Sequence, residues 1–159
     1  MGAKAEIEAL KDLRAALGRV SDSYWADRTE EQILAVSAWV AVLDGAGDRA
    51  LKLMRAAADN EDASVKHIAM ENRLYPMREL LGDLLLELKL PAAALAEYEA
   101  ALKSTPNRFR GLLGIARSAH ALGDRAKAVE HYGRLADLAK NADSDRNEIR
   151  EARAFLASR

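Results

Sequence analysis

The sequence contains no cysteine and only three prolines among its 159 residues. Without cysteine the chain can form neither a disulfide nor a thiolate metal site. Runs rich in Val, Ile and Thr, which a strand-rich protein would need, are also missing. Ala, Leu, Glu, Lys and Arg dominate the composition instead, and these are strong helix formers. We therefore expect an all-α protein that forms a single domain.

An excess of charge of one sign is missing as well. The chain carries 24 basic and 25 acidic residues, which are interspersed and give a net charge of −1. This balance does not favour nucleic acid as a partner. The longest apolar run, residues 38–43, is too short to span a bilayer, and the first residues lack the apolar segment of a signal peptide. We expect a cytoplasmic or periplasmic protein, and the sequence does not choose between these compartments.

A regular spacing of apolar residues is present between residues 75 and 108. It comprises Leu81, Gly82, Leu85, Ala94, Tyr98, Ala101 and Pro106. This spacing is typical of the tetratricopeptide repeat, a helix–turn–helix unit of 34 residues, although Arg78 replaces its opening Trp. Gly82 and Ala94 are small where two helices cross closely. Pro91 is suited to begin the second helix, and Thr105-Pro106 to end it.

The same register extends over most of the chain. Ala50, Ala94 and Ala128 take equivalent positions, and the second interval equals one repeat, whereas the first is 44 residues. About ten extra residues therefore lie within 59–74, which we interpret mostly as an inserted loop. The sequence thus predicts a right-handed α-solenoid of about three helical hairpins. Its expected parts are an N-terminal helix at 4–20, a degenerate repeat at 24–58, the inserted loop at 59–74, repeats at 75–108 and 109–140, and a capping helix at 144–158.

Local patterns give further expectations. Asp22 and its serine neighbours are candidates to cap the second helix, and Asp48 to cap a third helix that ends near Ala58. Asp145-x-x-Glu148 is a possible capping box for the last helix. The buried stripe of the second helix is predicted to comprise Trp25, Ile33, Val36, Trp39, Val40 and Leu43.

Several longer words also match known proteins. They are Ala38-Trp39-Val40, Leu53-Met54-Arg55-Ala56-Ala57-Ala58, Lys66-His67, Arg78-Glu79-Leu80-Leu81-Gly82-Asp83, Pro106-Asn107-Arg108-Phe109 and Gly123-Asp124-Arg125-Ala126-Lys127-Ala128. In these words the chain resembles a C-terminal segment shared by many bacterial tetratricopeptide-repeat proteins. The resemblance implies a non-catalytic protein-interaction scaffold, and it names no ligand.

A binding surface can be predicted from the repeat register. First helices line the concave face of such arrays, so the positions two, five, nine and twelve residues into each repeat are candidates to contact a peptide or protein segment. We call them the groove positions. The alternative explanation is a solvated helix face, with Trp39 packed into the core. In the inserted loop, Lys66 and His67 are further candidates. The groove positions are Gln32, Ala35, Trp39 and Val42; Pro76, Glu79, Asp83 and Leu86; and Arg110, Leu113, Arg117 and His120.

Motifs for catalysis and metal binding are missing. The sequence has no Gly-x-Ser-x-Gly word, no glycine-rich phosphate loop and no HExxH. Glu79 and Asp83 share a helix face and, with His67 and His120, offer oxygen and imidazole ligands, but their spacing is not that of a metal site. We therefore expect neither an enzyme nor a cofactor or metal, and we interpret His131 as a surface residue.

A structural or oligomerisation domain without a groove ligand stays open as a second hypothesis. Trp25 and Tyr24 begin the second helix, and Phe155 lies near the other end of the chain. An apolar patch that stays exposed at either place would mark an oligomer contact. The partner on the first hypothesis is a protein or peptide, whose identity the sequence does not give.

Overall fold

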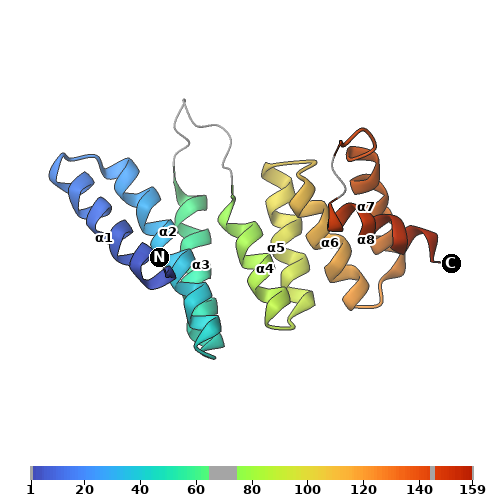
Figure 1. The fold of residues 1–159 in the computed structure, drawn as a ribbon, viewed down its shortest axis with the longest axis horizontal. Coiled ribbons are helices and arrows are strands. Elements are labelled where there is room, and N and C mark those ends of the chain that lie inside the picture. Colours follow the sequence, from blue (N-terminus) through green and yellow to red (C-terminus); the bar gives the residue numbers. More distant parts are fainter. Residues whose placement is uncertain (1, 65–74, 144–145, 159) are drawn as a thin grey trace. The chain divides into compact units, whose positions relative to one another are not determined.

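The structure, a computed structural model, describes residues 2–64, 75–143 and 146–158. These residues form eight α-helices and no strand (Figure 1), which confirms the all-α prediction. None of the helices is long and apolar enough to cross a membrane in the part of the chain that the structure describes. The helices are α1 (Ala3–Arg19), α2 (Ser23–Leu43), α3 (Gly47–Ala63), α4 (Met77–Glu87), α5 (Pro91–Ser104), α6 (Phe109–Ala121), α7 (Arg125–Leu138) and α8 (Asn147–Ala157).

The chain divides into two compact units, Met1–Leu84 and Leu85–Arg159, and the boundary falls inside α4. In the first unit, α2 packs against both α1 and α3 (Figure 1). Small side chains line these contacts and let the helices approach closely. The buried residues of the three helices include Ile7, Ala35, Ala38, Ala41, Ala50, Met54, Ala57 and Ala58.

The predicted buried stripe of α2 is only partly correct. Ile33 is buried, but Leu43 is 84% exposed and Trp25 is 40% exposed. The prediction assumed one apolar face, whereas α2 lies between two helices and buries alanines toward them. Leu43 is the last residue of α2 and precedes the turn at Gly45, which has a φ of +73°. No neighbouring helix covers a side chain at that position in the described residues.

Helix α3 is longer than expected. It continues to Ala63, so residues 59–63, which we predicted to begin the inserted loop, are helical. Its last turns bury Glu61, of which 4% is exposed, and this burial favours helix where the polar composition suggested a loop. The remainder of the predicted loop, with Lys66 and His67, lies outside the described residues apart from its first position, Ser64.

Some helices begin at the residues that the sequence predicted, and others do not. The Asp22 carboxylate accepts a hydrogen bond of 3.2 Å from the Trp25 backbone N–H, which confirms the predicted cap of α2. Pro91 begins α5 as predicted. By contrast, Asp48 lies inside the first turn of α3, whose N-cap is Ala46. The N-cap of α8 is Arg146, without a side-chain hydrogen bond, and Asp145, the first residue of the predicted capping box, lies outside the described residues.

The second unit consists of α5 to α8 and the end of α4. Helix α6 packs against α5 and α7, and α8 packs against α7. The signature residues of the two regular repeats are buried, as predicted. Those of the first are Leu81, Gly82, Leu85, Ala94, Tyr98 and Ala101. One core cluster in the second unit comprises Leu112, Leu113, Ala116, Ala119, Ala128, Tyr132, Leu135 and Ala152.

Candidate functional site

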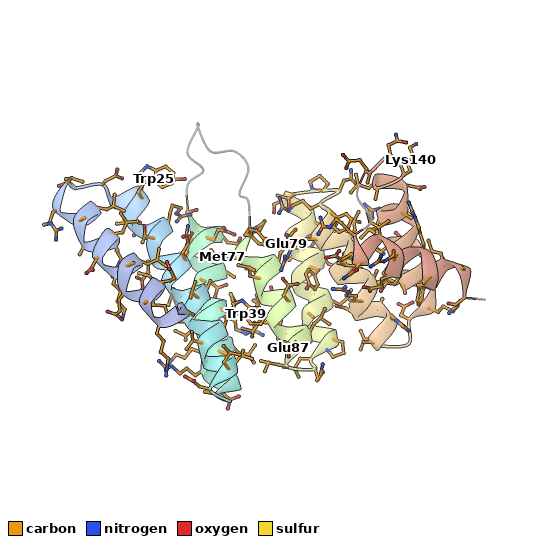
Figure 2. All side chains as sticks on the ribbon, viewed as in Figure 1. Trp25, Trp39, Met77, Glu79, Glu87 and Lys140 are labelled. Atoms are coloured by element: carbon orange, nitrogen blue, oxygen red, sulfur yellow. The ribbon has the colours of Figure 1, made fainter. Side chains whose placement is uncertain are left out.

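The groove positions of α2 present a partly open surface in the first unit. Gln32 is exposed, Trp39 and Val42 are half-buried, and Ala35 is buried. Figure 2 labels Trp39 on this helix and Trp25 at its first turn. Trp39 therefore packs in part against its neighbours and keeps part of its surface accessible.

The groove positions of α4 differ from the expectation. Glu79 is fully buried, with 0% exposed, although we predicted it on an open face. Pro76 is buried, and Asp83 and Leu86 are half-buried. Figure 2 shows Glu79 close to Met77 at the start of α4. The repeat register predicts on which face of a helix a residue lies, but not which neighbouring segment of the chain covers that face. It therefore overestimated the accessibility of Glu79.

The carboxylate of Glu61 on α3 fixes the start of α4, and no sequence pattern indicated this contact. The Met77 backbone N–H donates a hydrogen bond of 2.8 Å to Glu61 Oε2 on α3. A negative charge is favourable at a helix N-terminus, where the N–H groups lack partners within the helix. Next to it, Arg78 Nε lies 2.5 Å from Asp62 Oδ2. Glu61 therefore acts as an N-cap that is supplied by another helix.

The end of α3 is also joined to α2. Arg28 donates a hydrogen bond of 2.7 Å to the Ser64 hydroxyl, and its other Nη lies 2.7 Å from the carboxylate of Glu31. Both members of this ion pair are largely buried, and the Ser64 hydroxyl donates in turn to the Glu61 carbonyl. Beside them lies an open pocket of about 330 Å³, lined by Asp27, Arg28, Glu30, Asn60, Ala63 and Ser64.

The groove positions of α6 are largely engaged within the second unit. Leu113 is buried in the core, with 6% exposed, and Arg110 is half-buried. Arg117 and His120 are exposed, yet both contact α8. Arg117 forms a two-pronged ion pair with Glu151, with Nε–Oε1 at 2.9 Å and Nη2–Oε2 at 2.5 Å. The His120 ring lies 4.8 Å from the ring of Phe155, centroid to centroid.

The Glu151 carboxylate has a second donor. The Tyr132 hydroxyl on α7 donates to Glu151 Oε1 at 2.6 Å. The hydrogen bond from Arg117 lowers the pKa of Glu151, and the bond from Tyr132 acts in the same direction against the effect of burial. Burial raises the pKa of Tyr132 well above its usual range, and the adjacent carboxylate raises it further. The pKa of Arg117 is raised, chiefly by its hydrogen bond to Glu151.

The candidate metal ligands do not form a site in the part of the chain that the structure describes, where no group of three or more His, Asp or Glu side chains is placed to hold an ion. His67, one of those candidates, lies outside it. His131 is buried rather than exposed, because α7 turns it inward and its Nδ1 lies 3.0 Å from the Lys127 carbonyl.

The groove positions are thus divided between the units. Gln32, Trp39, Glu79 and Asp83 belong to the first, and Leu86, Arg110, Leu113, Arg117 and His120 to the second. Two of the α6 positions, Arg117 and His120, contact side chains of α8, namely Glu151 and Phe155.

Comparisons with known proteins support the architecture. No protein-family model matches the sequence, and no curated protein is significantly similar to it. Among solved structures, PcrH from Pseudomonas aeruginosa aligns with a TM-score of 0.61 at 21% identity, over 79% of this chain and 88% of that one. The first TPR of Spaghetti (RPAP3), solved with an HSP90 peptide, aligns with a TM-score of 0.59 at 19% identity, over 81% and 94%. MamA from Desulfovibrio magneticus RS-1 gives 0.54 at 13% identity, over 94% and 90%. At these identities the likeness concerns the fold, and the chain has the fold of a tetratricopeptide-repeat protein.

Proposed function

We propose that this chain is a non-catalytic scaffold that binds a peptide or protein segment on the groove positions of its first helices. The observation that carries the proposal is the face of α2, where Gln32 is exposed and Trp39 is half-buried. An indole that is partly accessible beside a polar side chain is a typical anchor for a protein ligand. The RPAP3 structure with its bound peptide SRMEEVD supports a ligand of this kind for the fold.

The ligand of this chain is expected to differ from that acidic peptide. A clamp for a terminal carboxylate needs cations or amides at groove positions, whereas α4 carries Glu79 and Asp83 there. Glu79 and Leu113 are buried and do not contribute to a surface. Arg117 is already paired with Glu151. The α2 face therefore carries the proposal, and its partner is expected to supply apolar side chains for Trp39.

A photo-crosslinking amino acid tests the proposal. It is placed at position 32 on α2 and, in a control protein, at position 52 on α3, which is also exposed. We expect a partner in a bacterial lysate to crosslink from position 32 and not from position 52. Trp39→Ala, with helicity checked by circular dichroism, should weaken that crosslink at least about tenfold, as for the loss of one anchor. Equal crosslinking from both positions, or no effect of Trp39→Ala, would contradict the proposal.

A specific observation favours the second hypothesis, an oligomerisation domain. Between α1 and α2, Val20 is 72% exposed and Trp25, in the first turn of α2, is 40% exposed, and Leu13 within α1 is 50% exposed. Phe155, at the other end, is half-buried against α6 and α7 and does not form such a patch. If the first patch is a contact between copies, light scattering should show a dimer that Val20→Glu converts to a monomer. A monomeric wild type would contradict the oligomerisation hypothesis, and the scaffold hypothesis would then be the one that remains.

A further inference from the structure

Helix α8 corresponds to the first helix of another repeat. Its Glu151 follows Arg117 of α6 by 34 residues, which is one repeat length, and the two side chains form the ion pair described above. At the same interval, Ile115 and Ile149 are both buried, with 1% and 2% exposed. In the preceding repeat the second helix, α7, packs against the first helix, α6. No helix takes the equivalent place beside α8 in the described residues.

The face of α8 that would receive a second helix is exposed and basic. In α6 the corresponding residues include Ala116 and Ala119, which are buried in the core cluster together with residues of α7. One repeat length later, Arg150 and Arg153 of α8 are exposed. Arg150 contacts Asn147 of its own helix, and Arg153 forms no ion pair with another described residue. Guanidinium groups on an exposed helix face favour a partner that carries carboxylates.

One face of α7 is uncharged and uncovered. Ala126 is exposed, Val129 is 40% exposed, and Gly133 and Ala136 are half-buried. Because these residues follow one another at intervals of three or four, they lie on one side of the helix. A Cβ added at Gly133 would meet no atom within 4 Å, so the space above the helix is open there.

The array shows what this face of a second helix contacts. One repeat length before Gly133 lies Glu99 of α5, which is itself a second helix. Glu99 pairs with Lys127 of α7 at 2.6 Å. This side of a second helix therefore faces the second helix of the next repeat, which at α7 has no counterpart in the described residues.

The uncovered face of α7 adjoins α8. Val129 and Ala136 lie three residues before and four residues after Tyr132, so they are its neighbours on the helix surface. Tyr132 contacts α8 through Glu151 and Phe155. The two uncovered faces thus lie side by side, and together we call them the α7–α8 face. It consists of Val129, Gly133, Ala136, Arg150 and Arg153.

We propose that the α7–α8 face binds an amphipathic helix of another protein, in the place that the second helix of the last repeat would take. The small residues of α7 let a helix approach closely, so one side of the partner helix carries aliphatic residues. Arg150 and Arg153 lie beside them, so the adjoining side of the partner carries Asp or Glu. Charge complementarity decides for an acidic helix, because the face holds two guanidinium groups and no carboxylate. The proposal goes beyond the proposed function because it involves neither α2 nor the groove positions.

The probes for the test are two fluorescein-labelled synthetic peptides of the same composition, each of about 20 residues so that they form helices. In the first, leucines at i, i+4, i+7 and i+11 form one stripe, and glutamates form the stripes next to it. In the second, the glutamates lie on the opposite side. Fluorescence anisotropy should show that the full chain binds the first at least about tenfold more tightly. Equal affinities, or no binding of the first peptide, would overturn the proposal, since both peptides have the same charge.

Charge reversal tests the basic part of the face. Arg150→Glu with Arg153→Glu should weaken binding of the first peptide at least about tenfold, and a peptide with lysine in place of glutamate should bind this variant instead. The matched control, Arg19→Glu with Lys52→Glu, changes the net charge equally at exposed positions of the first unit and should leave the affinity unchanged. Equal losses in the two double variants would reveal general attraction between opposite charges and refute a specific face.

A larger side chain tests the apolar part. Gly133→Gln fills the open space above α7 and should weaken binding at least about tenfold, whereas Ala9→Gln, at an exposed position of α1, should not. Circular dichroism checks that both variants stay helical. Unchanged affinity in Gly133→Gln would place the peptide elsewhere and overturn the proposal. Dimers of the wild type in light scattering that Arg150→Glu with Arg153→Glu abolishes, without peptide binding, would assign the face to a second copy and overturn the proposed partner.

Discussion

Gly114 lies in α6 where the ring of Tyr98 from α5 packs against the helix backbone. A Cβ added at this position would lie 2.3 Å from two carbons of that ring. Tyr98 is fully buried and has little room to move. We therefore expect Gly114→Ala to lower the free energy of unfolding by about 1–3 kcal/mol, because overpacking outweighs the better helix propensity of alanine. Urea unfolding followed by circular dichroism measures the change.

Gly133 in α7 is the matched control for this substitution. An added Cβ there meets no atom within 4 Å. Gly133→Ala should therefore leave stability unchanged or raise it by up to about 1 kcal/mol. If both alanine variants raised stability, close packing at Gly114 would be refuted.

Residue types predicted this contact better than they predicted the candidate site. Gly111 and Gly114 lie three residues apart inside α6, a spacing that is typical of close packing between helices, and Gly114 shows such packing. By contrast, the sequence placed Glu79 on an open face, and it is buried. A glycine in a helix has a local signature, whereas the burial of a carboxylate depends on which other segments cover it.

At the scale of elements, the N-terminus of α4 depends on α3. Glu61 is nearly fully buried and accepts the backbone N–H of Met77. Glu61→Ala would leave that N–H unpaired, so we expect a loss of about 1–3 kcal/mol in the free energy of unfolding. Exchange of the first-turn amides of α4 should also become faster, as hydrogen-exchange mass spectrometry can measure.

Asp62 supplies the control for the cap. Its side chain is 44% exposed and pairs with Arg78, which also lies 3.5 Å from Asp59. Asp62→Ala should cost about 1 kcal/mol or less, as for other exposed ion pairs. Equal losses from Asp62→Ala and Glu61→Ala would show that the effect at position 61 is not a helix cap.

The start of α2 followed from a residue a few positions away in the chain, and the sequence predicted it correctly. Asp22 caps α2, and Pro91 begins α5. The start of α4 depends on α3 through Glu61, and no local pattern marks it. For the same reason the sequence predicted an apolar face on α8 but not its partners, because the pairing of Arg117 with Glu151 requires knowing how α6 and α8 pack.

At the scale of the whole molecule, the charges nearly cancel, with a net charge of −1. General repulsion is therefore small near neutral pH, and specific carboxylates contribute to the pH dependence of stability. Glu151 and Glu148 both have a lowered pKa in the folded chain. Glu148 is held by its own backbone N–H and by Arg146, and Glu151 by Arg117 and Tyr132.

The sign of this contribution follows from the direction of the shift. The pKa of Glu151 is lower in the folded chain than in the unfolded chain, where it is about 4.3. Its stabilisation is therefore fully present above that unfolded value and is lost as the pH falls through the folded value. Because the Glu151 side chain is 34% exposed, solvent screens its ion pair with Arg117. We therefore expect the pair to contribute about 1 kcal/mol to the free energy of unfolding.

Glu151→Gln should therefore lower the free energy of unfolding most at pH 6–7 and progressively less below about pH 4. Urea titrations of the whole chain at several pH values measure the difference between the variant and the wild type. Glu130→Gln is the control, because Glu130 is 61% exposed and lies 4.0 Å from Arg134, so its effect should be small at every pH. A difference for Glu151→Gln that stayed constant down to pH 3 would mean that packing, rather than the charge that joins α8 to α6, accounts for its effect.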